Sequence, residues 1–153
     1  MLNSLKSFLK EITLGKQEKL PYQDDDHRLA AAALMFHIIA VDGEVETEEL
    51  SALNKTLKNA YSLSEEETDN LIKLAKERDD EAVDLYGFTS VLKRQLSEEE
   101  RVKVIEMMWE MVFADGSVHE FEDNTIWRVA ELLGVSSRQR MELKKQVSER
   151  HQQ

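Results

Sequence analysis

One short motif occurs twice in this chain, and the repetition constrains the fold more than any other feature. Residues 41–49 read Val-Asp-Gly-Glu-Val-Glu-Thr-Glu-Glu, and residues 114–122, 73 positions later, read Ala-Asp-Gly-Ser-Val-His-Glu-Phe-Glu. Both copies keep the pattern Asp-Gly-x-Val-x-x-x-Glu, and each follows an apolar run and precedes an amphipathic one. Such self-similarity predicts an internal duplication, here of a helix–corner–helix unit.

The composition favours a single, all-helical domain. At 153 residues the chain has the length of one domain that can bury its own core. It holds one proline and five glycines, and no segment alternates apolar and polar residues for long enough to predict a strand. The absence of cysteine excludes disulfides, cysteine zinc sites and thiol chemistry, and it fits a reducing compartment.

Apolar residues recur at helical spacing and predict a bundle of about eight helices. We expect two pseudo-symmetric helix–corner–helix halves, the second to fourth and the sixth to eighth helices, joined by the fifth. The second and sixth helices are apolar almost all round, which is typical of the centre of a bundle. Residues 1–23 are assigned to an N-terminal amphipathic helix and linker, and residues 24–150 to the helical domain. The predicted helices cover about residues 2–13, 26–41, 47–60, 65–78, 85–96, 98–113, 120–133 and 137–149.

Several helix starts carry capping residues. Ser64–Glu67 and Ser97–Glu100 have the spacing of capping boxes. The acidic run Asp24–Asp26, Thr47 and Ser136 are the predicted N-terminal caps of three further helices.

Finer predictions concern helix ends and faces. Gly134 suits a helix C-terminus, and Asp79-Asp80 should end the fourth helix. Phe121 and Met141 should face the core. His37, the one polar residue in the apolar run of the second helix, should be a satisfied structural group rather than a ligand.

The N-terminal segment differs from the remainder in charge. Residues 1–20 carry a net charge of +2, so the other residues carry −13 of the total of −11. The segment suits docking on the domain, or contact with a membrane surface or a partner. We favour docking, because five apolar positions alone give weak membrane affinity. Those positions are Leu2, Leu5, Phe8, Leu9 and Ile12.

The acidic balance also bears on partners and location. A net charge of −11 repels nucleic-acid phosphates but is compatible with cations and with basic protein partners. No apolar run is long enough to span a bilayer, and polar residues interrupt what would be the core of a signal peptide. We therefore expect a cytoplasmic protein that binds no nucleic acid and has an unidentified protein partner.

The two Asp-Gly corners have a purely structural interpretation. Gly43 and Gly116 can adopt the left-handed conformation that ends a helix. Asp42, Asp115 and the glutamates in the next first turn can accept hydrogen bonds from free backbone amides. Val45 and Val118 can fold back as apolar contacts. This interpretation needs no ligand.

A cation site is the alternative interpretation. Residues 42–49 hold five carboxylates and no basic residue, and residues 115–123 hold four carboxylates. Carboxylates at a sharp turn suit calcium or magnesium, although neither copy has the spacing of an EF-hand. Zinc is a weaker candidate, because His119 is the only soft ligand nearby.

Catalytic patterns are lacking. No Glu-x-x-His pair that a di-iron carboxylate centre needs occurs in the sequence, and neither does a glycine-rich phosphate loop. We therefore expect a protein that is not an enzyme.

The duplicated motif resembles that of the TerB-like tellurite-resistance family, in particular its uncharacterised bacterial branch. The likeness covers about residues 24–150. Besides the two corners it includes the stretches Val112–Asp123, Asp26–Ala30 and Asp84–Tyr86.

The resemblance implies an all-helical bundle with two pseudo-symmetric halves. It also implies a role in tellurite and chemical-stress resistance, acidic clusters that bind a divalent metal, and membrane-linked complexes. Two positions of the second copy depart from the first, since His119 stands where Glu46 would be and Phe121 where Glu48 would be. The implied metal ligands are Asp42, Glu46 and Glu49, then Asp115 and Glu122, to which His119 is added as the residue at the position of Glu46.

The sequence thus predicts a non-enzymatic, stress-associated protein that binds a divalent cation or a protein partner. The alternative is a structural interaction module whose acidic corners are only helix caps.

Overall fold

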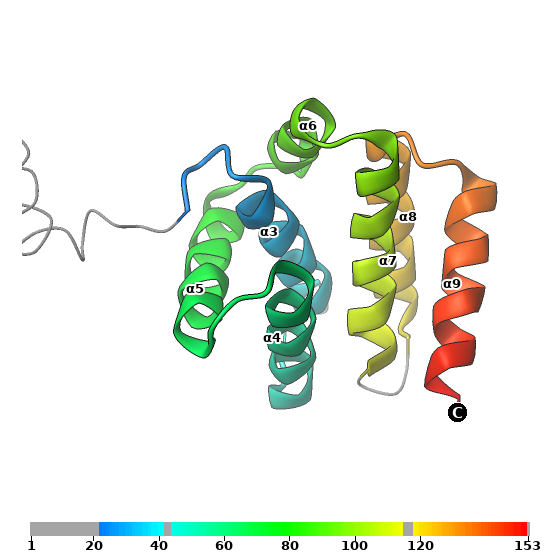
Figure 1. Cartoon of the computed structure of the whole chain (residues 1–153), viewed down its shortest axis with the longest axis horizontal. Coiled ribbons are helices and arrows are strands. Elements are labelled where there is room, and N and C mark those ends of the chain that lie inside the picture. The colour runs from blue at the N-terminus through cyan, green and yellow to red at the C-terminus, as the bar shows by residue number, and fades with distance from the viewer. Residues whose placement is uncertain (1–21, 42–43, 115–117, 153) are drawn as a thin grey trace, which may run out of the picture.

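The computed structural model describes residues 22–152 except 42–43 and 115–117, and within those residues it contains seven helices and no strand (Figure 1). The all-α prediction is therefore confirmed for this part of the chain. The predicted helix over residues 2–13 lies outside the described residues, as do Asp42, Gly43, Asp115 and Gly116. The helices are α3 (His27–Ala40), α4 (Thr47–Tyr61), α5 (Glu65–Glu81), α6 (Tyr86–Gln95), α7 (Glu98–Ala114), α8 (Glu120–Leu133) and α9 (Ser137–His151).

Helix α3 lies at the centre of the molecule. All residues from Leu29 to Met35 are buried, and the helix packs most extensively against α5 and also contacts α4, α6, α7 and α8. Four consecutive alanines, residues 30–33, add no bulk beyond Cβ, so neighbouring helices can approach the α3 backbone closely. An apolar surface on all sides requires such an enclosed position.

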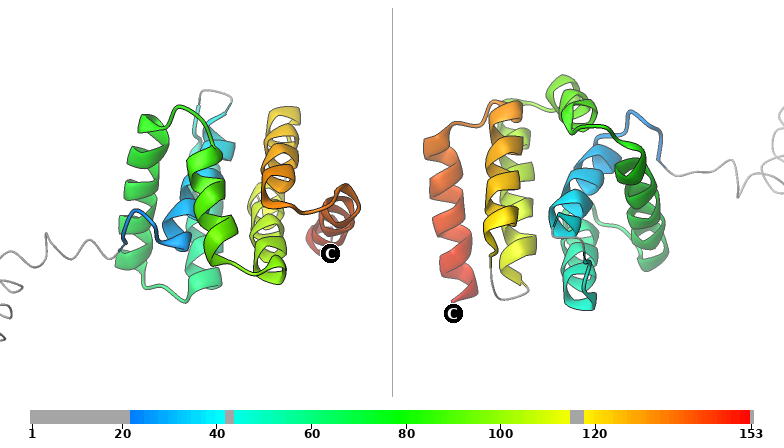
Figure 2. Two further views of the ribbon diagram at one scale, coloured as in Figure 1. Left: turned by 90° about the horizontal axis from the view of Figure 1, so that it is seen from above. Right: turned by 180° about the vertical axis from the view of Figure 1, so that it is seen from behind.

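Six of the seven described helices form two groups, and α6 lies between them (Figure 2). One group is α3, α4 and α5, and the other is α7, α8 and α9, with α7 packed most extensively against α9. Helix α6 contacts both α3 and α8, and α4 also packs against α7, so the two groups are in contact. Trp109 and Met108 of α7 are fully buried and fill the core between the helices.

Most of the predicted caps are present. Ser64 and Glu67 form a reciprocal capping box, and so do Ser97 and Glu100. The carboxylate of Asp26 accepts a hydrogen bond from the backbone N–H of Arg28, 2.8 Å away. Two further predictions are confirmed by the cap at Ser136 and by the left-handed conformation of Gly134.

Two helix boundaries were predicted wrongly. Helix α5 does not end before Asp79 but continues to Glu81. Oδ1 of Asp79 lies 2.8 Å from Nδ1 of His37 in α3, and this contact stabilises the last turn. This long-range pair holds the last turn in place although acidic residues are unfavourable at a helix C-terminus. The N-cap of α4 is Glu46 rather than Thr47, which is the first helical residue.

Two side chains were assigned to the wrong helix face. Phe121 is 61% exposed and Met141 is 52% exposed, whereas both were expected in the core. The buried face of α8 follows Glu122, Ile126 and Val129, so Phe121 lies one position off that face. In α9 the buried residues are Leu143 and Val147.

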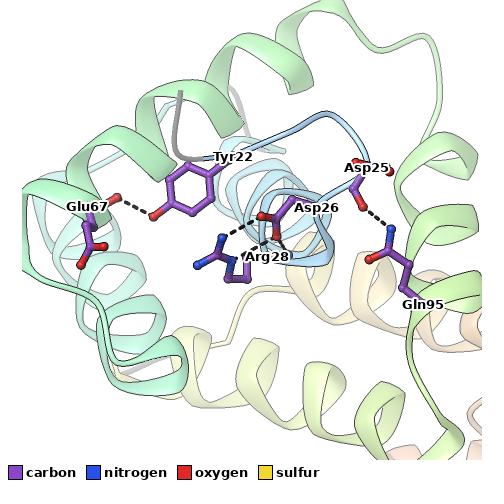
Figure 3. A network of polar contacts seen from close by, with 6 residues as sticks. All are labelled: Tyr22, Asp25, Asp26, Arg28, Glu67 and Gln95. Atoms are coloured by element: carbon purple, nitrogen blue, oxygen red, sulfur yellow. Dashed lines mark hydrogen bonds and ion pairs between the residues drawn. The ribbon is translucent and has the colours of Figure 1, made fainter. Parts of the chain in front are cut away.

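A polar network ties residues 22–28, at the start of α3, to the neighbouring helices (Figure 3). The buried Tyr22 donates a hydrogen bond from its hydroxyl to the backbone oxygen of Glu67 in α5, at 2.9 Å. The guanidinium of Arg28 lies 4.7 Å from the centre of the Tyr22 ring and also pairs with Asp26. Gln95 of α6 donates to the backbone oxygen of Asp25. The start of α3 is thereby tied to both α5 and α6.

Candidate functional site

The first corner ends in a cap at the start of α4. Glu46 is the N-cap residue, and its backbone N–H donates to Oε1 of Glu49 at 2.9 Å. Glu49 is only 4% exposed, while Glu46 is exposed. The predicted use of Glu49 to satisfy a backbone amide is confirmed.

The second corner repeats this arrangement at the start of α8. His119 is the N-cap residue, and its backbone N–H donates to Oε1 of Glu122 at 3.0 Å. Glu122 is 3% exposed, and the side chain of His119 is exposed. The exchange of glutamate for histidine at the N-cap therefore leaves the glutamate three residues later in the same role.

Glu49 and Glu122 are the only buried charged side chains among the described residues. A buried carboxylate is costly unless hydrogen bonds and favourable charge compensate for the loss of water. Here the first turn of a helix supplies free amides and the positive end of the helix dipole. Val45 and Val118 pack against the core beside these caps, as the structural interpretation predicted.

The described residues do not by themselves make a metal site. Among them, no group of three or more histidine, aspartate or glutamate side chains could hold an ion. Of the predicted ligands, each corner contributes one exposed residue, Glu46 or His119, and one buried glutamate that already caps a helix. Asp42 and Asp115 lie outside the described residues, so the predicted cation sites stay a prediction.

His37 pairs with a side chain of the protein, as predicted for a structural group, but it lies at the surface. Its Nδ1 lies 2.8 Å from Oδ1 of Asp79, but the ring is partly exposed rather than enclosed in the core. The pair borders a depression of about 460 Å³ that Leu85, Tyr86 and Arg128 also line. A second depression, beside Phe121 and Trp127, shares His37, Leu85 and Arg128 with the first.

Exposed apolar side chains line these two adjoining depressions, and the sequence analysis did not predict this grouping. We call this region the rear surface, because α3 and α8 face the viewer when the molecule is seen from behind (Figure 2, right). Only the high apolar content of segment 83–88 and of α8 hinted at it in the sequence. The exposed apolar residues of the rear surface are Val83, Tyr86, Phe121 and Trp127.

Shifted pKa values of the carboxyl groups of Asp26, Glu67 and Glu100 reflect their roles at helix starts. Burial opposes charge on Asp26, yet hydrogen bonds from the side chain and backbone of Arg28 outweigh it and hold the pKa of Asp26 below its ordinary value. Hydrogen bonds from the backbone and side chain of Ser64 lower the pKa of Glu67. Those from Ser97 lower the pKa of Glu100 in the same way. All three shifts have a structural cause.

No helix in the described part of the chain has the length and apolar character needed to cross a membrane.

Comparison with known proteins identifies the family of the chain. The family model described as tellurite resistance protein TerB matches residues 28–145, which is well over half of the chain. No curated protein and no solved structure matches the chain significantly. The matched range includes both Asp-Gly corners and all of α4 to α8.

Proposed function

Because the chain belongs to the family of the tellurite resistance protein TerB, we propose that it is a non-enzymatic, stress-associated protein that acts by binding a protein partner. In this proposal the two acidic corners are helix caps that shape the bundle. In this proposal the protein acts in the cytoplasm. It binds no nucleic acid, since its net charge of −11 repels phosphate backbones.

The rear surface is the observation that carries this proposal. Exposed apolar side chains scattered singly are ordinary, and several gathered around two depressions support a role in association. Tyrosine, tryptophan and phenylalanine are also the side chains enriched in protein interfaces. Three of the four apolar residues of the rear surface are of these types.

Charge specifies the kind of partner. Asp79, Asp84 and Glu131 line the same depressions, against one permanently positive side chain, Arg128. We infer that the partner presents an apolar segment with basic flanks, which fits both the aromatic residues and the negative charge.

Tellurite tolerance of a sensitive bacterial host that produces this chain tests the proposal. We expect protection by the wild-type chain, loss of protection with Phe121→Asp, and full protection with the control Met141→Asp. Both residues are exposed, and an aspartate at position 121 suits the first turn of α8, so neither change should unfold the domain. No protection by the wild-type chain would refute the stress role, and full protection by Phe121→Asp would refute the role of the rear surface.

A divalent cation at the corners is the second candidate function. It is favoured by two buried glutamates at equivalent places in acidic segments. The ligands would come from Asp42, Glu46 and Glu49, and from Asp115, His119 and Glu122, with calcium or magnesium preferred over zinc. The engagement of Glu49 and Glu122 as caps leads us to rank this candidate second.

We also propose that the two groups of helices are pseudo-symmetric halves. Beyond the two corners, a left-handed residue ends α4 at Ser62 and α8 at Gly134. A capping box then starts the next helix in each case, at Ser64 and at Ser136. These matching local features support the duplication.

A further inference from the structure

Helix α9 stands at one end of the molecule, beyond α7 and α8 (Figure 1). It packs most extensively against α7 and also contacts α8. Only two of its 15 residues, Leu143 and Val147, are buried. Helix α5, the third helix of the other group, buries four side chains. The attachment of α9 therefore relies less on apolar burial than that of α5.

Charge favours the attachment of α9. This helix holds five basic residues against two acidic ones, a net charge of +3 with histidine neutral. Helix α7 holds five acidic against two basic residues, and α8 holds four against one, so each carries −3. Helix α5, in contrast, holds eight acidic against three basic residues. A positive helix thus lies against two negative ones, and electrostatic attraction stabilises its docked position.

Several of the charged contacts between α9 and α7 lie in the last turn of α9. The guanidinium of Arg150 pairs with Glu106 at 2.6 Å and with Glu110 at 2.5 Å. Nε2 of His151 lies 2.9 Å from Oε2 of Glu110. All four side chains are partly exposed, so dissolved salt weakens these contacts.

Two cationic or aromatic side chains of α9 also cover aromatic rings of α7. Nζ of Lys144 lies 5.3 Å from the centre of the Trp109 ring and 3.3 Å from Oδ1 of Asp123 in α8. The ring of His151 stacks on Phe113, at 6.4 Å between ring centres. Removal of α9 would uncover these aromatic side chains, which are of the kind enriched in protein interfaces.

We propose that α9 is a latch, a helix that opens as a unit about residues 134–136 while the other described helices stay folded. Its ion pairs with α7 and α8 hold it closed, so a rise in ionic strength opens it. The connection of three residues keeps the open segment close to its site, which favours reclosure. Trp109 and Phe113 lie outside the rear surface, so the latch does not require the partner proposed above.

The length of α9 makes such opening accessible. Isolated helices of about 12–15 residues are marginally stable in water, so α9 depends on its contacts with α7 and α8 to stay helical. Its backbone amides are therefore exposed to solvent exchange whenever it leaves them.

Hydrogen exchange of the full-length chain tests the latch helix by helix. We expect the protection factors of Leu143 and Val147 in α9 to be at least about tenfold below those of Leu71 and Leu74 in α5. Sodium chloride raised from about 0.01 M to about 1 M shortens the Debye length from about 30 Å to about 3 Å. This change should lower the protection of α9 several-fold further and should not lower that of α5.

Two arginine variants provide a matched comparison. Arg150→Ala removes the pairs with both glutamates of α7 and should lower the protection of α9 about three- to tenfold at low salt. Arg138→Ala makes the same exchange at an exposed residue whose partner, Glu142, belongs to α9 itself, and it should not lower the protection. Since both variants replace arginine by alanine in one helix, helix propensity cannot explain a difference.

Four results would overturn the proposal. Equal protection of α9 and α5 would show that the two helices open together. Protection that falls steadily towards His151 would indicate fraying of the helix end. The other two contrary results are protection of α9 that does not respond to salt, and an equal loss with Arg138→Ala and Arg150→Ala.

Discussion

Two buried carboxylates, Glu49 and Glu122, stabilise the starts of α4 and α8. Glu49→Ala should lower the free energy of unfolding by about 1–3 kcal/mol, because it removes a charged hydrogen-bond acceptor from the N-terminus of α4. Glu122→Ala should have a similar effect on α8. Urea denaturation measures both.

The neighbouring exposed glutamates serve as controls for these two variants. Glu48→Ala and Glu120→Ala change acidic residues in the same first turns, so each should cost less than about 0.5 kcal/mol. Equal losses for buried and exposed positions would contradict the capping role.

The lowered pKa of Asp26 makes the stability of the fold depend on pH in the acid range. Since its pKa is lowered in the folded state, its contribution to stability is fully present above the ordinary value of 3.8 and is lost as the pH falls through the lowered pKa. Asp26→Asn should flatten the decline of the melting temperature below about pH 4. Asp25→Asn, at an exposed neighbour, should leave the decline as in the wild type; the same flattening in both variants would exclude Asp26 as its source.

At the scale of an element, the ends of α4 and α8 differ in a way that stability measurements can detect. Both end in the left-handed conformation, at Ser62 with φ 53° and at Gly134 with φ 77°. Ser62→Gly should raise stability and Gly134→Ala should lower it, each by about 1 kcal/mol, since only glycine adopts this conformation without strain.

The space around Gly134 allows Gly134→Ala to report on backbone strain without a steric clash. The nearest atom to an added Cβ is Nη1 of Arg101 at 3.6 Å, an ordinary contact, so backbone strain alone should account for the loss. Changes of the same sign in the two variants would contradict a conformational cause.

Helix starts could be predicted from the sequence because their signals are local. The boxes at Ser64 and Ser97 need only residues three positions apart, and the structure contains both. The end of α5 could not be predicted in this way. It depends on Asp79 meeting His37, which lies 42 residues away in the chain.

Helix faces were predicted well where the apolar pattern is dense and poorly where it is sparse. For α3, an error of one position in the predicted buried face has no consequence, since this helix is buried on nearly all sides. In α8 the same error moved Phe121 from the core to the rear surface. The burial of Glu122 was not foreseen, because a glutamate in a first turn is ordinarily exposed.

At the scale of the whole molecule, the family and the helical bundle could be predicted from the duplicated corners, while the rear surface could not. The rear surface gathers residues from α3, α5, the α5–α6 connection, α6 and α8. Only packing brings these elements together, and no local pattern in the sequence marks their meeting point. The candidate ligands at the corners were found from the sequence, but their use as caps required the geometry.

The central claim is that the corners are structural caps, and thermal unfolding of chelated protein with millimolar calcium, magnesium or zinc tests it most directly. We predict the same melting temperature in every case, together with lowered melting temperatures for Glu49→Ala and Glu122→Ala that no ion restores. An ion at 100 times its dissociation constant would add about 2.7 kcal/mol, or about 5–10 °C for a chain of this size. A rise of that size with one ion, lost in Asp42→Asn or Asp115→Asn, would contradict the claim and make the corners cation sites.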